Sequence, residues 1–193
     1  MKYKTREEWL LAGVELLKPI FKEHGYKVPA KIRVSCGFPS KQALSNHKRR
    51  IGECWADKAS EGKFFEIFIS PVLSKPFQAL DTLLHELIHA TVGLEHKHRG
   101  EFKVCATKIG MKGKMTECGA GDKLKPVLEK HLKTLGQYPH DKLEGMTTGK
   151  KNKPRDPYTK ASCPDCGYII RTTRKWIETG MPICPCGGEF VES

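Results

Sequence analysis

The chain has 193 residues, of which 38% are hydrophobic and 29% charged. This length and composition allow one full domain with a small satellite and exclude a largely disordered chain. No apolar run reaches the roughly 20 residues of a membrane span, and the N-terminal segment, interrupted by Glu7, Glu8 and Glu15, lacks the pattern of a secretory signal. We therefore expect an intracellular, cytoplasmic protein with no membrane partner.

The formal net charge is +12, and residues 1–138 hold 25 Lys/Arg against 15 Asp/Glu, a net +10. A surplus of this size favours a polyanionic partner, of which nucleic acid is the commonest. The alternative is a basic protein whose charge serves no specific partner.

The first expected element is an amphipathic helix over residues 6–24, because apolar side chains recur there at steps of three and four. Thr5 can cap this helix, and Gly25 ends it. Pro19 is expected to kink or split the helix near its end.

Three strands are expected next, over residues 31–36, 51–56 and 64–69, and the last two form a hairpin across a polar turn. Residues 41–50 are predicted to form an exposed loop or a short helix. The loop ends in the basic run Lys48-Arg49-Arg50. Such a run is either a solvated face or, close to the expected edge strand, a surface that faces DNA.

Three further helices are predicted, over residues 76–92, 99–109 and 122–135, with Gly93 as the C-terminal stop of the first. A polar segment rich in Gly, Lys and Pro follows. The sequence thus predicts a main domain over 1–138, a linker over 139–158 and a small cysteine-rich domain over 159–193.

The strongest chemical signal is the motif HELIH at positions 85–89 of the predicted helix 76–92. Its two imidazoles, His85 and His89, lie four residues apart and therefore project from one helical face, where they can bind one ion. Glu86 lies beside the first ligand and can accept a proton from a zinc-bound water. The motif predicts a catalytic zinc site with Glu86 as general base.

A catalytic zinc site needs a third protein ligand. The metzincin subclass is excluded, because Val92 and Glu95 occupy the positions where it has Gly and His. Three candidates remain, namely His96, His98 and Glu101.

The last 31 residues contain two cysteine pairs, Cys163 with Cys166 and Cys184 with Cys186. Two such pairs joined by a segment of alternating character predict a zinc ribbon with a closed, structural site of four thiolates. The second pair has CxC spacing and so needs a tighter turn than CxxC. The alternative is a reactive dithiol pair, which would require a neighbouring helix. The remaining cysteines (Cys36, Cys54, Cys105 and Cys118) are interpreted as small buried residues.

Basic and aromatic residues in the tail form a candidate surface for single-stranded nucleic acid. They are Lys160, Arg171, Arg174, Lys175, Tyr168 and Trp176. The alternative is that Tyr168 and Trp176 close the small core of the ribbon.

The run LLHELIHA at 83–90, followed by His98-x-Gly-Glu-Phe, resembles the signature of the SprT/Spartan family of zinc metallopeptidases. Residues 51–55 and 65–70 resemble the strands that precede the same helix, and the tail resembles the zinc ribbon of many members. Arg99-Gly100 stands where the family often has Gly-Pro, a departure that affects the geometry of the loop.

This resemblance implies an α+β, zincin-like fold with an N-terminal helix, a small three-stranded sheet, the HExxH helix and a C-terminal ribbon. It also implies that His98, rather than His96, is the third ligand. The implied activity is the cleavage of DNA-bound or DNA-crosslinked proteins in DNA repair, by a monomer with one catalytic and one structural Zn²⁺. Two other functions stay open: a non-catalytic, zinc-containing nucleic-acid-binding protein, and a general peptidase indifferent to DNA.

Overall fold

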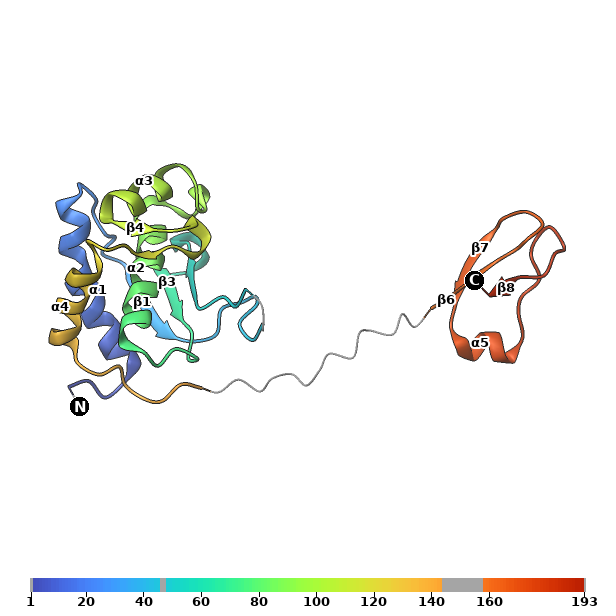
Figure 1. Ribbon diagram of the computed structural model, residues 1–193, viewed down its shortest axis with the longest axis horizontal. Helices are drawn as coiled ribbons and strands as arrows, with labels where there is room; N and C mark the ends of the chain where they lie inside the picture. Colours follow the sequence, from blue (N-terminus) through green and yellow to red (C-terminus); the bar gives the residue numbers. More distant parts are fainter. Residues whose placement is uncertain (1, 46–47, 144–157, 193) are drawn as a thin grey trace. The chain divides into compact units, whose positions relative to one another are not determined.

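A computed structural model describes residues 2–45, 48–143 and 158–192, and the chain divides into two compact units, Met1–Met146 and Thr147–Ser193 (Figure 1). Both units are built from helices and small sheets, so the predicted α+β class is confirmed. Most of the predicted linker lies outside the described residues. None of the helices among the described residues combines the length and the apolar character that a membrane span requires.

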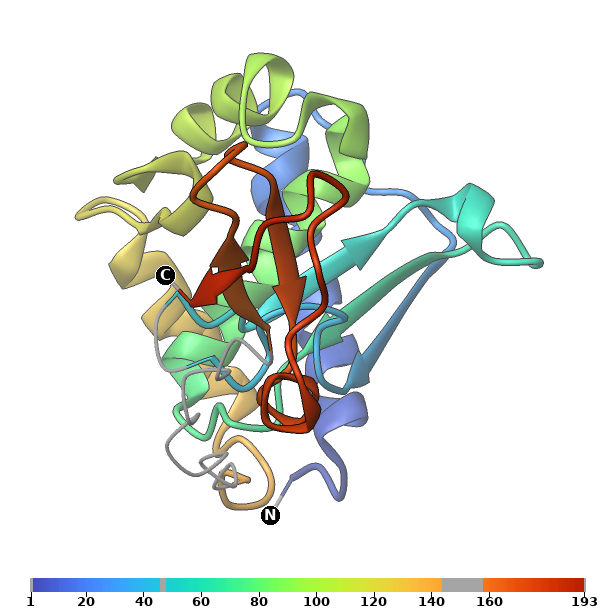
Figure 2. The ribbon, with the colours of Figure 1, turned by 90° about the vertical axis from the view of Figure 1, so that its right-hand side faces the viewer.

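The first unit contains a three-stranded sheet of β1 (Ile32–Cys36), β3 (Phe65–Ile69) and β2 (Gly52–Trp55), in that order. β1 runs parallel to β3, while β2 and β3 form the predicted antiparallel hairpin. The turn of the hairpin contains the short helix η1 (Asp57–Ala59) and extends beyond the rest of the unit (Figure 2). This order places β2 at an edge of the sheet.

Helix α1 (Arg6–Glu23) begins with the predicted cap, in which Thr5 accepts from the backbone N–H of Glu8 and the Glu8 side chain accepts in return. Pro19 does not split the helix, which is continuous from Arg6 to Glu23. The missing hydrogen bond is offset by apolar burial on both sides of the proline, because Leu17 and Phe21 are fully buried.

Helix α2 (Pro76–Val92) packs with α1 on one face of the sheet. Its apolar stripe is buried against the inward side chains of the strands, among them Ile67 and Ile69. Gly93 ends α2 with a positive φ of 98°. α3 (Gly100–Ile109) and α4 (Lys125–Leu135) pack against α2.

Several short elements were not predicted. They connect the longer helices: η2 (Leu94–His96), β4 (Met111–Lys112), η3 (Met115–Glu117) and β5 (Gly119–Ala120). β4 and β5 form an antiparallel pair of two residues each. β5 contacts α2, which brings residues 118–120 next to the helix that carries the motif.

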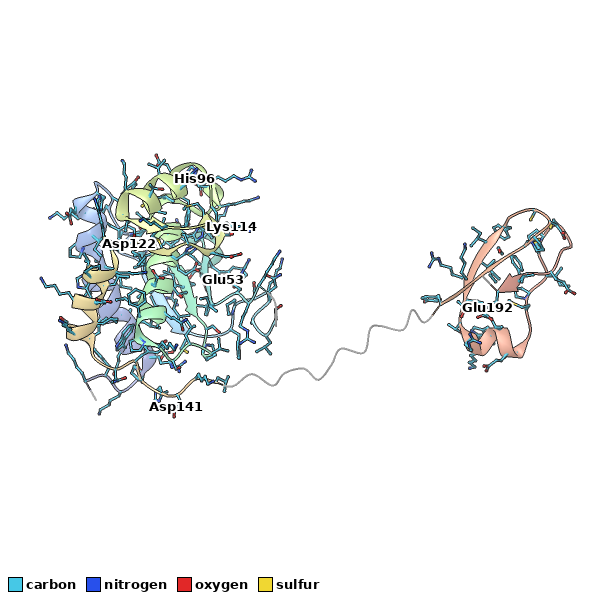
Figure 3. The ribbon with its side chains drawn as sticks, in the orientation of Figure 1. Glu53, His96, Lys114, Asp122, Asp141 and Glu192 are labelled. Carbon is cyan, nitrogen blue, oxygen red and sulfur yellow. The ribbon has the colours of Figure 1, made fainter. Side chains whose placement is uncertain are left out.

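Arg6 binds the segment that follows α4. It is buried, and its guanidinium donates to the carbonyl oxygens of Pro139 (2.9 Å), Asp141 (2.7 Å) and, in the loop after β3, Pro71 (2.9 Å). The guanidinium also stacks on Tyr138, 4.9 Å from the ring centroid. Residues 139–141 (Asp141 is labelled in Figure 3) are therefore held on the first unit.

The second unit is a sheet of β7 (Ile169–Thr172), β6 (Thr159–Ser162) and β8 (Val191–Glu192), with one short helix, α5 (Arg174–Thr179). The helix was not predicted. The small core consists of four buried residues: Ala161, Cys163, Cys184 and Phe190.

Candidate metal centres

Three imidazoles converge in the first unit. His85 and His89 project from one face of α2, as their spacing predicts, and His98 comes from the loop before α3. The Nε2 atom of His98 lies 3.2 Å from the Nε2 atoms of both other histidines. All three donor atoms fall within 4.8 Å of one another, a grouping that can hold a metal ion.

The geometry fits a tetrahedral zinc ion. Zinc–nitrogen bonds of about 2.0–2.1 Å at tetrahedral angles place two ligating nitrogens about 3.3 Å apart. Burial, with help from the neighbouring imidazoles, lowers the pKa of His85 to about 4 and that of His89 to about 3. Both rings are therefore neutral near pH 7, the state in which imidazole binds metals.

A tight turn positions His98. Arg99 N–H donates to the carbonyl of His96 at 2.9 Å, and Lys97 has φ 48° and ψ −117°, the conformation of the first central residue of a type II′ turn. The fully buried Phe102 of α3 packs against all three imidazoles, with ring centroids 4.3–5.1 Å apart. This ring forms an apolar side of the site.

The other two candidate ligands lie outside this group. His96, labelled in Figure 3, has Nε2 3.9 Å from a carboxylate oxygen of Glu95. Glu101 accepts a hydrogen bond from the hydroxyl of Tyr26 at 3.4 Å. The structure thus brings His98, and neither alternative, to His85 and His89.

Glu86 lies beside these histidines and is 7% exposed. Burial raises its pKa to about 8, and the positive charge of Arg50 partly opposes this rise. The carboxylate lies against β2, since a Cβ built on Gly52 would come within 2.6 Å of Glu86 Oε1. The predicted general base therefore lies between the histidines and the edge strand.

Cys118 is a neighbour of the site that sequence analysis missed. It is buried as expected, and its Sγ lies 3.4 Å from His85 Nδ1. The two residues are 33 positions apart, and no spacing rule connects them. Of the other scattered cysteines, Cys105 is buried, whereas Cys36 and Cys54 are only partly buried.

The second unit contains the other metal-binding group. The sulfurs of Cys163 and Cys186 lie 3.6 Å apart, and those of Cys166 and Cys184 lie 3.5 Å apart. These separations are much longer than a disulfide bond of about 2.05 Å. They come close to the roughly 3.8 Å expected for two thiolates on tetrahedral zinc. The four cysteines can hold one metal ion.

Glycines make the turns of both cysteine pairs possible. Gly167 (φ 75°) and Gly187 (φ 90°) have left-handed backbones. Their N–H groups donate to the carbonyls of Cys163 (2.9 Å) and Cys184 (2.8 Å). The CxC pair thus obtains its tight turn from the glycine directly after it.

The candidate nucleic-acid residues fall in two places. In the first unit, Lys48 and Arg49 are exposed, whereas Arg50 pairs with Glu53 at 2.6 Å. The positive charge of Arg50 acts to lower the pKa values of Glu86, His89 and His98, so Arg50 lies within electrostatic reach of this carboxylate and of two of the three imidazoles.

On the second unit, Trp176 is 57% exposed, with the ammonium group of Lys175 5.1 Å from its ring centroid. Trp176 therefore does not close the core of the ribbon. Arg171 is exposed on β7, and Arg174 donates to Glu192 at 2.9 Å.

Comparison of the chain with protein-family models, with curated proteins and with solved structures gave no match.

Proposed function

We propose that this protein is a zinc-dependent metallopeptidase of the SprT/Spartan kind, with a zincin-like first unit and a zinc ribbon as second unit. One observation carries the proposal: three imidazole nitrogens converge, with His98 Nε2 3.2 Å from each of the other two, beside the buried carboxylate of Glu86. Three neutral nitrogen donors with an adjacent carboxylate are the set that metal-assisted peptide hydrolysis uses.

In this proposal His85, His89 and His98 hold the ion. When bound, zinc would lower the pKa of a coordinated water, act as a Lewis acid that polarises the peptide carbonyl, and favour the ionised form of Glu86 by its charge. Glu86 accepts the proton of the attacking water and passes it to the leaving nitrogen. Its restraint by Gly52 of β2 and its burial keep the carboxylate oriented for this transfer.

The edge position of β2 supports binding of an extended substrate. A strand at a sheet edge can pair with an added peptide through its backbone groups. Because Gly52 of this strand touches Glu86, a peptide aligned on β2 passes close to the general base. The substrates are therefore proposed to be proteins with an extended, accessible segment.

Association with DNA, in particular single-stranded DNA, is the second part of the proposal. The net charge of +12 and the exposed Trp176, Lys175 and Arg171 of the ribbon support it, since stacking and phosphate contacts together bind single strands. Proteins bound or crosslinked to DNA are then the proposed substrates.

The test is incubation of the zinc-loaded full chain with DNA-bound protein substrates, comparing wild type with Glu86→Gln. We expect wild type to cleave and the variant to lose activity by at least about 100-fold, because the general base is removed. Glu86→Gln must keep the zinc content of wild type, so that the loss is assigned to proton transfer. Equal cleavage by both proteins would reject the peptidase mechanism.

A salt series separates the remaining functions. Binding to single-stranded DNA that weakens steeply with ionic strength supports DNA association. Salt-dependent binding without any proteolysis would favour a non-catalytic nucleic-acid-binding protein. Proteolysis without binding would favour a general peptidase.

A further inference from the structure

Asp81 is an acidic residue of α2 to which the proposed reaction gives no role. It lies one helical turn before His85, so both side chains project from the same face of the helix. Asp81 is partly buried and accepts a hydrogen bond from a backbone group: Ala120 N–H donates to its Oδ1 at 2.9 Å. The Ala120 N–H and the charge of Lys125 offset the loss of solvation only in part, because the pKa of Asp81 stays raised, so the presence of this carboxylate requires an explanation.

The segment 118–120 contacts this face of α2 at two points. Asp81 accepts from Ala120 N–H, and His85, one turn later, has its Nδ1 3.4 Å from the Sγ of Cys118. A ligand imidazole is oriented by the hydrogen bond of its second nitrogen. The position of Cys118 thus affects how the ring of His85 is held.

The other contacts of this segment are apolar or short: Cys118 and Ala120 are buried in the core of the first unit. Its strand, β5, has two residues and pairs only with the equally short β4. Gly119 allows the carboxylate to approach closely, since a Cβ there would lie 2.7 Å from Asp81 Oδ2. The buried Nδ1 of His89 has no hydrogen-bond partner among the described residues. Of the two histidines on α2, His85 is therefore the one whose ring orientation a neighbouring group can fix.

We propose that Asp81 is a positioning residue of the candidate metal centre: by fixing residues 118–120 on α2, it places Cys118 against the Nδ1 of His85 and so orients this ring for metal binding. This inference rests on the metal site of the proposed function but not on proteolysis. Its readout is therefore metal affinity.

The experiment titrates the metal-free full chain with Co²⁺ and then measures Zn²⁺ affinity by competition. The two sites are distinguished because thiolate ligands give intense charge-transfer absorption that imidazole ligands lack. The four-cysteine site is thus an internal reference in every sample. We expect Asp81→Ala to weaken the histidine site by about 10–100-fold, the usual effect of losing an outer hydrogen bond, and to leave the cysteine site unchanged.

Three further variants make the test specific. Asp81→Asn keeps an oxygen that can accept from Ala120 and should stay within about threefold of wild-type affinity. Gly119→Ala pushes against the carboxylate from the other side and should weaken the histidine site as Asp81→Ala does. Asp122→Ala removes an exposed aspartate that pairs with Lys112 of β4 at 2.7 Å, and should have no effect.

Wild-type affinity in Asp81→Ala, or equal losses in the Ala and Asn variants, would overturn the proposal. If Asp81→Ala does not fold, Gly119→Ala and Asp81→Asn decide it by the same criteria. Wild-type protein whose histidines bind no metal would reject the metal centre itself, whereas normal metal affinities without proteolysis would reject only the peptidase.

Discussion

Gly52 and Glu86 are in such close contact that no side chain fits between them. A Cβ on Gly52 would lie 2.6 Å from Glu86 Oε1 and 2.7 Å from Thr82 Cγ2. The backbone of Gly52 has an ordinary conformation for a strand. Glycine is required at this position because the Glu86 carboxylate occupies the space that a side chain would fill. The edge strand and the candidate general base therefore constrain each other.

We predict that Gly52→Ala reduces kcat by about 100-fold or more, because a shift of the carboxylate by about 1 Å removes it from the path of the proton. The zinc content should not change, because the atoms nearest to the added methyl belong to Glu86 and Thr82 and not to a histidine of the site. Steady-state kinetics and metal analysis of the purified variant measure both. Gly37→Ala, whose new methyl meets Phe68 at 3.1 Å instead, is the control and should retain activity.

We predict about two zinc ions per chain, one for each ligand group. His98→Ala should loosen one of them, and His96→Ala neither, because only His98 converges with His85 and His89. Metal analysis after dialysis against a weak chelator measures the retained zinc. Two tightly held ions in His98→Ala, together with one in His96→Ala, would transfer the ligand role to His96.

Lys97 has a positive φ of 48° directly before His98. A non-glycine residue in this conformation costs about 1–3 kcal/mol. We expect Lys97→Gly to melt no lower than wild type, and Lys97→Val, whose branched Cβ tolerates this conformation least, to melt lower in thermal denaturation. Lys103→Val, at an exposed position of α3, controls for the loss of a lysine. Equal melting temperatures of Lys97→Val and Lys97→Gly would contradict this prediction, because they would show that the turn adopts another conformation without loss of stability.

The raised pKa of the Asp81 carboxyl should make the free energy of unfolding depend on pH. Burial raises its pKa from 3.8 to about 6. The folded state therefore binds this proton more tightly than the unfolded state does, and the stabilisation is complete below pH 3.8 and is lost as the pH rises through about 6.

In metal-free protein, Asp81→Asn should consequently equal wild type near pH 4 and exceed it by on the order of 1–3 kcal/mol at pH 7. Urea denaturation at the two pH values measures the difference. A difference that does not depend on pH would contradict the assignment, and Asp122→Asn, at an exposed position, should show none.

Local sequence patterns determine much of this fold. The helix 76–92 was predicted with its observed ends, because an apolar stripe, a proline at its start and Gly93 at its end all agree. The three strands and the hairpin follow from alternation and turn residues, to within one or two residues. Likewise, the four-residue spacing of His85 and His89 was sufficient to place them on one face.

Contacts between distant segments could not be predicted in this way. The pairing of β1 with β3, the contact of Cys118 with His85 and the role of Gly52 each join residues that no periodicity relates. α5 was missed because its six residues are too few to establish a helical period. The uninterrupted α1 shows that tertiary burial can override a local helix breaker such as Pro19.

The bonds of Arg6 determine where the first unit can be cut. A fragment that stops at residue 138, the boundary expected from composition, would remove the carbonyls of Pro139, His140 and Asp141 and leave a buried cation short of acceptors. Recombinant versions of this half should therefore extend to at least Leu143, whose N–H donates to Pro71 O at 2.8 Å. Residues 139–143 are therefore as much a part of the first unit as its first helix.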